Sequence, residues 1–390
     1  MIVANENTIV RKAYFAGTHR VRPPTETLAW IQPRLAEFGI TRVADVTWLD
    51  DIGIPVYQAI RPNARTLSVS QGKGLDRDSA KVSAVMESIE LWHAERLERP
   101  DRLVATPEEV ADDLGYVPDE LALHPRHCLN RATRIEWWPA RRLIDGAESL
   151  VPFDCLDLDG RVRPRWRPPV FMSSSNGLAS GNTDGEAILH ALYEVIERDA
   201  VSRAQRKGAG QVVDPASVSG RGRDLLERFS AADVRVRMEL LPTPVGTPCF
   251  GVVIWSETFP VPFTGHGCHS DREVALCRAL TEAAQSRVTV IAGARDDVGT
   301  TQYQRARNVR FGMRPAPRRT TSGPGRTPAV DFQRIASADF LDVGEEIENA
   351  TRRVVAVTGR SPLVVDHTRA DVGVPVARVV CPGLDFPGHP

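Results

Sequence analysis

The chain has 390 residues, of which 42% are hydrophobic and 25% are charged, and its formal net charge is −1. These values are typical of a globular protein with a large core, and the near-zero charge argues against a nucleic-acid-binding or membrane-surface protein. Residues 1–17 contain no long apolar run, and no stretch reaches the ~18 apolar residues of a spanning helix. We therefore expect a cytoplasmic protein with no nucleic-acid or membrane partner.

The predicted elements alternate between helices and strands, which indicates an α/β fold. In chain order, the apolar periodicity predicts helices at Thr27–Ile40, Arg77–Arg96, Thr183–Arg206, Arg221–Phe229, Ser270–Ala292 and Gly344–Val357. The predicted strands are Val43–Trp48, Pro55–Arg61, Leu67–Ser70, Glu136–Pro139, Val234–Leu241, Phe250–Trp255, Pro362–Asp366 and Val374–Val380. Val151–Trp166 is predicted to form two strands joined by a turn at Asp159-Gly160.

We expect a single domain over residues 1–390. Its predicted parts are an N-terminal portion (1–66), a core (67–300), a mobile basic loop (312–330) and a C-terminal portion (331–390), with residues 97–150 forming a peripheral segment inside the core. The loop contains four prolines, three glycines and four arginines, which disfavour regular structure. It is interpreted either as a solvated linker or as a surface that grips an acidic peptide.

An internal repeat supports one common centre. Glu87 and Glu90 recur 107 residues later as Glu194 and Glu197. A weaker third copy follows 88 residues further on, where the pair reads Glu282 and Gln285. The flanking alanines and a glycine before the helix repeat with it, so three similar helices are predicted to carry acidic or amide groups at positions i and i+3.

The paired glutamates suit a magnesium site. Residues three apart on a helix lie on one face, with Cβ atoms roughly 5–6 Å apart, so each pair can address one ion. Mg²⁺ prefers hard oxygen ligands that it shares with water and phosphates. A single pair would more often be a solvated helix face. The duplication and the apolar neighbours of both pairs favour Glu87, Glu90, Glu194 and Glu197 as metal ligands.

The segment before the first of these helices resembles a phosphate-binding loop in composition. Gly72-Lys73-Gly74 is predicted to form a turn whose backbone N–H groups approach phosphate oxygens, with Lys73 as the counter-charge. Ser79 and Ser83 are candidate hydroxyl contacts or simply helix-surface residues. Neither GxxxxGK[ST] nor GxGxxG is present, which disfavours the common nucleotide-binding folds.

Two arginines and the cysteines leave alternatives open. Arg198 follows Glu197, and Arg278 precedes Glu282 by four positions, so each arginine could bind phosphate or hold a glutamate in an ion pair. Six cysteines without a CxxC pair fit reduced thiols. Cys268 near His269 could form a metal or thiol–imidazole pair, but a buried thiol is the simpler interpretation.

Together, these residues resemble the YcaO family of ATP-dependent peptide-modifying enzymes. The resemblance runs from Gly39–Thr47 to Cys381–Leu384 and is carried by three blocks, Ser70–Trp92, Ser175–Ala200 and Arg278–Arg287. It implies an α/β fold with repeated strand–helix units around a central site for ATP and Mg²⁺. The site residues implied are Lys73, Ser79, Ser83, Asn182, Glu186, Arg198, Arg278, Glu282 and Gln285 for ATP, and Glu87, Glu90, Glu194 and Glu197 for the metal. No catalytic residue is identified.

The family's reaction phosphorylates a peptide amide oxygen, so that a nucleophile can replace it. The sequence departs from the azoline-forming members, which end in PxPxP, whereas this chain ends Pro382–Pro390. Leu91 and Ala179 also stand where many members have Arg and Ser. The Glu90–His93 and Cys381–Leu384 stretches look like the branch that works with a TfuA protein, which implies thioamide formation.

The resemblance implies a peptide or protein substrate, a TfuA-like partner and a separate leader-binding or sulfur-supplying protein, and it allows a homodimer. An azoline- or amidine-forming cyclodehydratase is the alternative enzyme. From another class, the chain would be a non-catalytic ATP-binding accessory protein for a protein-modifying enzyme. His93 and His190 lie beside the glutamates in sequence, and we interpret both as structural histidines.

Overall fold

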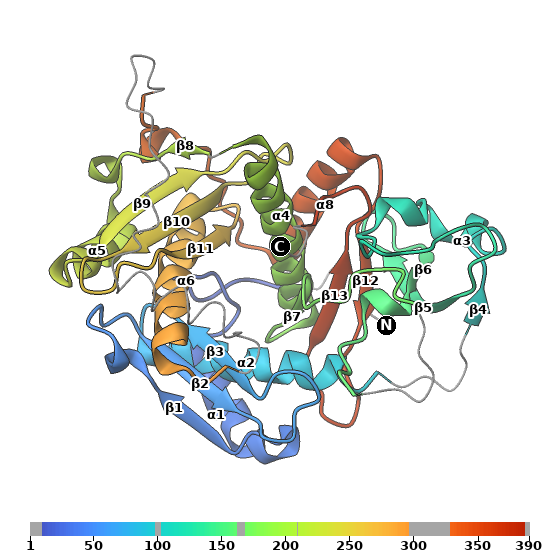
Figure 1. Cartoon of the computed structure of the whole chain (residues 1–390), viewed down its shortest axis with the longest axis horizontal. Helices are drawn as coiled ribbons and strands as arrows, with labels where there is room; N and C mark the ends of the chain where they lie inside the picture. The colour runs from blue at the N-terminus through green and yellow to red at the C-terminus, as the bar shows by residue number, and fades with distance from the viewer. Residues whose placement is uncertain (1–9, 98–102, 162–167, 209, 296–327, 387–390) are drawn as a thin grey trace.

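Three antiparallel sheets form the framework of the protein (Figure 1). The computed structural model describes residues 10–97, 103–161, 168–208, 210–295 and 328–386. The sheets have the orders β1-β2-β3, β11-β10-β9-β8 and β4-β5-β12-β13-β7, with β6 paired to β5. The strands are β1 Arg42–Asp45, β2 Val56–Ile60, β3 Val69–Lys73, β4 Leu103–Ala105, β5 Ile135–Arg142, β6 Glu148–Pro152, β7 Leu178–Ser180, β8 Gln211–Val212, β9 Arg235–Leu240, β10 Cys249–Trp255, β11 Phe263–Cys268, β12 Leu363–Asp366 and β13 Val376–Val380. The predicted α/β class is confirmed.

Three long helices each follow a strand that stands at one end of a sheet. Helix α2 (Arg77–Ala94) follows β3, α4 (Asp184–Lys207) follows β7, and α6 (Arg272–Ala292) follows β11. Each helix also contacts the strand of another unit: α2 contacts β7, α4 contacts β11, and α6 contacts β3. The three units therefore close into a ring, and in Figure 1 their helices surround the middle of the molecule.

The helix starts follow the same spacing as the glutamates. The side chains of Asp76, Thr183 and Asp271 each accept a hydrogen bond from a backbone N–H of the first turn. Such N-caps satisfy donors that have no partner within the helix. These caps are separated by 107 and 88 residues, and Glu87 and Glu194 each lie eleven residues after their cap. The caps therefore set each acidic side chain at the same height along its helix.

Small residues let each helix lie close to its strand. A Cβ on Gly72 in β3 would lie 2.0 Å from the backbone N of Ala84 in α2, and one on Gly267 in β11 would lie 2.1 Å from the carbonyl O of Ala275 in α6. Each of the three helices carries two fully buried alanines at the repeated positions. They are Ala80, Ala84, Ala187, Ala191, Ala275 and Ala279. A larger side chain at these contacts would push the helix, with its glutamates, away from the sheet.

The first helix is shorter than predicted. Helix α1 spans Pro24–Ile31 and is followed by a 3₁₀ helix over Gln32–Phe38, so the predicted helix over Thr27–Ile40 is wrong in its second half. Pro33 lies at the change of geometry, and its ring lacks the N–H that an α-helix needs and collides with the preceding turn. Gly39, with φ of 71°, closes the segment.

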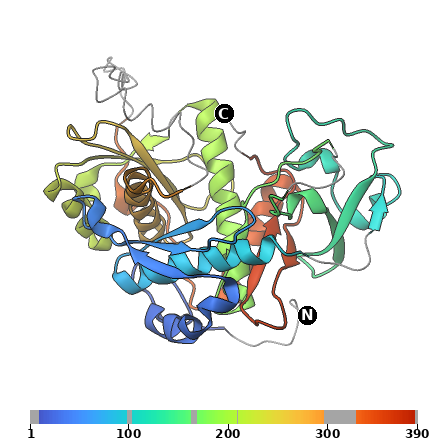
Figure 2. The ribbon, with the colours of Figure 1, turned by 60° about the horizontal axis from the view of Figure 1, so that its bottom comes forward.

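The strands of the segment before α4 pair differently from the prediction. β5 and β6 form a hairpin, whereas the second strand and the Asp159-Gly160 hairpin turn predicted within Val151–Trp166 are wrong for the described part of that segment. β6 ends at Pro152, and a 3₁₀ helix over residues 153–155 follows. The hairpin turn lies upstream instead, where Gly146 has φ of 73°. Figure 2 shows that β4–β6 stay at one side of the molecule, which fits a peripheral segment.

The other described α-helices are α3 (Ala111–Leu114), α5 (Gly220–Ala231) and α8 (Val343–Thr358). Among the described residues, no helix combines the length and the apolar character that crossing a bilayer would require. Most of the predicted 312–330 loop lies outside the described residues, and Val330 forms a parallel bridge with Val213. The division of the chain into four parts stays a prediction.

Candidate functional site

A cavity of about 1590 Å³ opens between α2, α4 and α6. Its wall contains every side chain that the sequence singled out for metal or nucleotide binding. These residues are Lys73, Ser79, Ser83, Glu87, Glu90, Asn182, Glu186, Glu194, Glu197, Arg198, Arg278, Glu282 and Gln285. The repeat therefore brings three distant segments of the chain to one polar centre.

The carboxylates of α2 are oriented by hydrogen bonds from two different units. The Gln71 N–H donates to Glu87 Oε2 over 3.2 Å. The N–H and the hydroxyl of Ser180, in β7, donate to Glu90 Oε1 over 2.8 and 2.7 Å. Each carboxylate is thus held through one oxygen, and β7 of the second unit takes part in positioning the first pair.

The acidic residues of α4 and α6 lie among basic groups. Arg198 Nη2 is 3.9 Å from Glu194 Oε1, which is a loose ion pair. Glu282 Oε2 accepts a hydrogen bond from Lys73 Nζ over 3.0 Å, so the third unit is joined directly to the first. The His266 backbone N–H lies 3.4 Å from the other oxygen of Glu282.

Most of these glutamates hold their protons more tightly than usual. Burial raises the pKa of Glu87 and of Glu194 to about 7 and that of Glu90 to about 8. Burial, followed by repulsion from Glu282, also raises the pKa of Glu197. The fixed cations of the protein therefore do not neutralise this cluster, and a bound divalent cation would stabilise its charged form.

Glu282 is the exception in the cluster. Burial by itself would raise its pKa, but Lys73 and Arg198 outweigh that effect and hold the pKa well below its usual range. Arg278 is different again, because burial and then Arg20 lower its pKa to about 10. Arg278 Nη1 donates a hydrogen bond to the Cys268 carbonyl over 3.4 Å. This geometry favours anion binding for Arg278 over an ion pair with Glu282.

Asn182 and Glu186 connect the cavity wall to the N-terminal part of the chain. Asn182 donates to Glu186 Oε2 from its backbone N–H and its side-chain amide, over 2.8 and 2.9 Å. Glu186 Oε1 accepts from the Val21 N–H over 2.5 Å, and Asn182 Oδ1 accepts from the Thr27 hydroxyl over 2.7 Å. Glu186 therefore uses its two carboxylate oxygens to anchor residue 21 and Asn182 at the cavity wall.

The two serines differ in their local setting. The Ser79 hydroxyl donates to Asp76 Oδ2 over 3.0 Å, as part of the cap of α2. Ser83 lies one turn before Glu87 on the same helix and lines the cavity.

Gln285 donates to the Gln71 carbonyl over 3.2 Å, while its Oε1 is buried without a hydrogen-bond partner in the described part of the chain.

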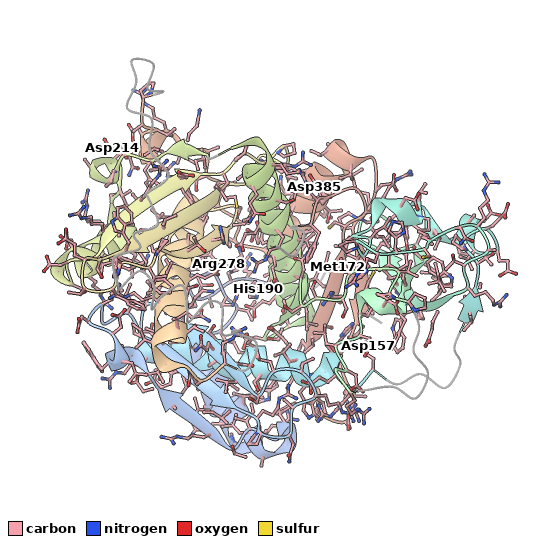
Figure 3. All side chains as sticks on the ribbon, viewed as in Figure 1. Asp157, Met172, His190, Asp214, Arg278 and Asp385 are labelled. Carbon is pink, nitrogen blue, oxygen red and sulfur yellow. The ribbon has the colours of Figure 1, made fainter. Side chains whose placement is uncertain are left out.

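Sequence reasoning missed several residues of the cavity. Arg20 and Arg22 enter it from the segment before α1, which no repeat or periodic pattern marks. His190, interpreted as structural, also lines the cavity, and burial and then Arg278 depress its pKa well below the usual value. Figure 3 labels His190 on α4 and Arg278 on α6, close together between the two helices.

The predicted turn at Gly72-Lys73-Gly74 is wrong. Gly72 and Lys73 belong to β3, where their backbone groups pair with β2, and only Gly74 lies beyond the strand. The glycine at position 72 is required by the close approach of α2, as described above. Lys73 still points its ammonium group into the cavity, where it meets Glu282. The glycine pattern in the sequence therefore reflects close helix–strand packing and not a phosphate-binding loop.

The shifted glutamates predict how the metal-free protein responds to pH. Unfolding returns Glu87, Glu90 and Glu194 to an ordinary pKa near 4.5. Between about pH 4.5 and 8 the folded state therefore binds more protons than the unfolded state, so the free energy of unfolding falls as the pH rises through this range and levels off above it. We expect the melting temperature of the metal-free protein to fall across this range. Mg²⁺ with a non-hydrolysable ATP analogue should reduce the fall, and a melting temperature that rises with pH without metal would contradict the assignment.

Comparisons with known proteins identify the class of protein that has this fold and site. The profile of the family described as YcaO cyclodehydratase, ATP- and Mg²⁺-binding, matches residues 71–385. A structure of YcaO from Methanopyrus kandleri bound with AMPPCP and Mg²⁺ superposes with a TM-score of 0.74 at 24% identity, covering 98% of this chain and 99% of that one. The similarity extends over the whole arrangement of sheets and helices.

Two curated relatives are closer in sequence. An uncharacterized protein of Mycobacterium tuberculosis is 40% identical over 373 residues, which cover 95% of this chain and 84% of that protein. An uncharacterized protein of Rhizobium leguminosarum bv. trifolii, named for its place in the tfuA 3′ region, is 36% identical over 393 residues, covering 94% of this chain and 88% of that protein. The chain belongs to the YcaO family of ATP- and Mg²⁺-binding proteins.

The cavity fits the ligands of this family. Four carboxylates with raised pKa values converge from two helices, and hard oxygen donors of this kind suit Mg²⁺. His190 Nδ1 and Gln285 Oε1 are buried polar atoms without a hydrogen-bond partner in the part of the chain that the structure describes. Lys73 and the arginines supply positive charge beside them. Such a combination suits a nucleoside triphosphate together with a divalent cation.

Proposed function

We propose that the chain uses ATP and Mg²⁺ to activate a backbone amide of a peptide or protein substrate by phosphorylating the amide oxygen. The convergence of the repeated glutamates on one cavity is the observation that carries this proposal. Glu87, Glu90, Glu194 and Glu197 would hold the metal. ATP supplies the phosphoryl group that turns the amide oxygen into part of a leaving group.

The other cavity residues prepare this site through charge and position. Arg278 hydrogen-bonds the Cys268 carbonyl and not a carboxylate, so its positive charge suits the phosphates. Lys73 and Glu282 form an ion pair whose charges cancel, and through it Lys73 positions Glu282. From this position at the cavity wall, Lys73 would also reach the nucleotide. The hydrogen bonds from Ser180 fix Glu90, and those to Glu186 hold the segment that carries Arg20.

Thioamide formation is the product that we favour. A nucleophile displaces the phosphorylated oxygen, and phosphate leaves; with sulfide as nucleophile, the net change is replacement of the amide oxygen by sulfur. The support is the relative named for the tfuA 3′ region, together with the Glu90–His93 and Cys381–Leu384 stretches, which resemble the TfuA-associated branch. A TfuA-like protein and a sulfur donor would be the partners. The family description as a cyclodehydratase favours azoline formation as the second candidate.

Product mass tests the proposal. The chain is incubated with ATP, Mg²⁺, sulfide, a TfuA-like protein and candidate peptides from its own organism, and the peptides are analysed by mass spectrometry. We expect a sulfur-for-oxygen replacement that requires both ATP and sulfide. Loss of water without sulfide would instead show the azoline-forming alternative.

A non-catalytic accessory role has its own signature. An accessory protein would bind the nucleotide, but peptides would not stimulate ADP formation. We expect peptide-dependent ADP formation that Glu194→Gln abolishes, with Glu227→Gln, a substitution on the exposed face of α5, as the matched control. The enzyme proposal would be overturned if the chain binds the nucleotide but no peptide stimulates ADP formation, even among peptides that other enzyme preparations modify.

A further inference from the structure

A second group of metal-ligand side chains lies outside the cavity. Single ligand atoms of His19, Asp271 and Asp339 all lie within 4.8 Å of one another. His19 belongs to the segment before α1, Asp271 caps α6, and Asp339 lies between the 3₁₀ helix at residues 332–334 and α8. None of the three lines the large cavity, and the glutamate repeat does not include them.

His19 is the most telling member of this group. It is only 8% exposed, and its Nδ1 is buried without a hydrogen-bond partner in the described part of the chain. Its Nε2 points towards Asp271 Oδ2 at 4.0 Å, which is too long for a hydrogen bond. Phe15 and His269 pack edge-on against the ring, with centroid distances of 5.0 and 5.1 Å. A buried imidazole normally has polar partners for its nitrogens, whereas within the described residues His19 Nδ1 has no hydrogen-bond partner and Nε2 faces Asp271 beyond hydrogen-bond distance.

The two aspartates leave oxygens for such a partner. Asp271 Oδ1 caps α6 by accepting from the N–H groups of residues 273 and 274, over 2.6 and 3.1 Å, while Oδ2 is the atom that faces His19. Asp339 is exposed, so its carboxylate can move without disturbing the core. Ligand atoms about 2.0–2.2 Å from a tetrahedral zinc ion lie about 3.3–3.6 Å from one another, so this group, whose ligand atoms lie within 4.8 Å, needs to contract by about 1 Å.

We propose that His19, Asp271 and Asp339 form a binding site for a first-row divalent transition metal ion such as Zn²⁺. One imidazole and two carboxylates suit zinc, with water completing the coordination, whereas Mg²⁺ prefers an all-oxygen set. The ion joins three distant parts of the chain. It fastens the segment that carries Arg20 to the start of α6, the helix that carries Arg278 and Glu282, so its binding would support the wall of the cavity.

Zinc binding to the full chain tests this site. The protein is freed of metal with a chelator, and Zn²⁺ is titrated by calorimetry in excess Mg²⁺, which competes for the glutamate cluster. We expect one zinc ion per chain in the unaltered protein. Asp339→Asn should weaken that binding by more than about 100-fold, because losing a group that merely orients a metal ligand already costs ~10–100-fold. Zn²⁺ should also raise the melting temperature of the unaltered protein and not that of Asp339→Asn.

Two control variants separate this site from adventitious zinc binding. Asp112→Asn removes another exposed carboxylate, and His127→Gln removes an exposed histidine next to Cys128. Both should bind zinc as the unaltered protein does, while His19→Gln should lose it. The proposal is overturned if zinc does not bind, if Asp339→Asn binds it normally, or if His127→Gln loses it. If His19→Gln fails to fold, Asp339→Asn still tests the site, because Asp339 is exposed and its replacement should not disturb the core.

Discussion

Replacing Glu194 by Gln is expected to weaken binding of the magnesium–nucleotide complex by at least about 100-fold, since removal of a group that only supports a metal ligand already costs ~10–100-fold. Glutamine keeps the size and packing of the side chain but removes its negative charge. Glu194 and its neighbour Glu197 are partly protonated near neutral pH, because burial and repulsion from nearby carboxylates raise the pKa of both side chains. Calorimetric titration with a non-hydrolysable ATP analogue, with and without Mg²⁺, measures the loss.

The same substitution should have the opposite effect on the metal-free protein. At about pH 8 the ionised Glu194 is buried and lies near Glu197, so removing its charge should raise the melting temperature in the absence of metal. Glu227→Gln, on the exposed face of α5, serves as the control and should change neither quantity. Equal Mg²⁺-dependent affinity in Glu194→Gln and the control would remove Glu194 from the metal site.

Adding one methyl group at Gly72 is expected to destabilise the protein by about 3 kcal/mol or more, at the upper end of the cost of overpacking a core. The new Cβ would lie 2.0 Å from the Ala84 N and 2.3 Å from the Ala80 carbonyl O. Both are backbone atoms of α2, so no side chain can rotate away and the strand and helix must separate. Chemical denaturation of Gly72→Ala measures the change, and its nucleotide affinity should fall because Glu87 moves with α2.

Gly344→Ala provides the contrast for this prediction. Gly344 lies in the exposed first turn of α8, and its nearest neighbour is a side-chain oxygen of Asp342 at 3.0 Å. Alanine should be neutral or stabilising there by up to about 1 kcal/mol, because it restricts the unfolded chain without meeting the backbone. If Gly72→Ala were as stable as Gly344→Ala, the close contact between β3 and α2 would not exist as described.

The repeat made much of the site predictable from the sequence. A constant spacing of alanines and glutamates marked α2, α4 and α6, and all the residues selected on that basis line one cavity. The spacing works because three N-caps start the helices in the same register, although those caps were not recognised in the sequence. Periodicity also predicted the C-terminal helix and the two strands after it, close to α8, β12 and β13.

Other parts of the site carry no local signal. Strands β7 and β11 were not predicted, because β7 has three residues and β11 contains two glycines that lower its strand propensity. Arg20 comes from a segment that Glu186 anchors through the backbone N–H of residue 21, a contact across 165 positions of sequence. The glycine pattern at residues 72–74 was real but was assigned to phosphate binding when its cause is helix–strand packing.

A double-mutant cycle of Mg²⁺-dependent nucleotide binding tests the central claim most directly, which is that helices from different units build one metal–nucleotide site. Binding is measured by calorimetry for the unaltered protein, Glu87→Gln, Glu194→Gln and the double variant. Because Glu87 on α2 and Glu194 on α4 would act on the same bound complex, each single change should abolish most of the Mg²⁺-dependent affinity and the double change should cost much less than the sum. Additive effects, or tight binding that neither substitution alters, would contradict a shared site.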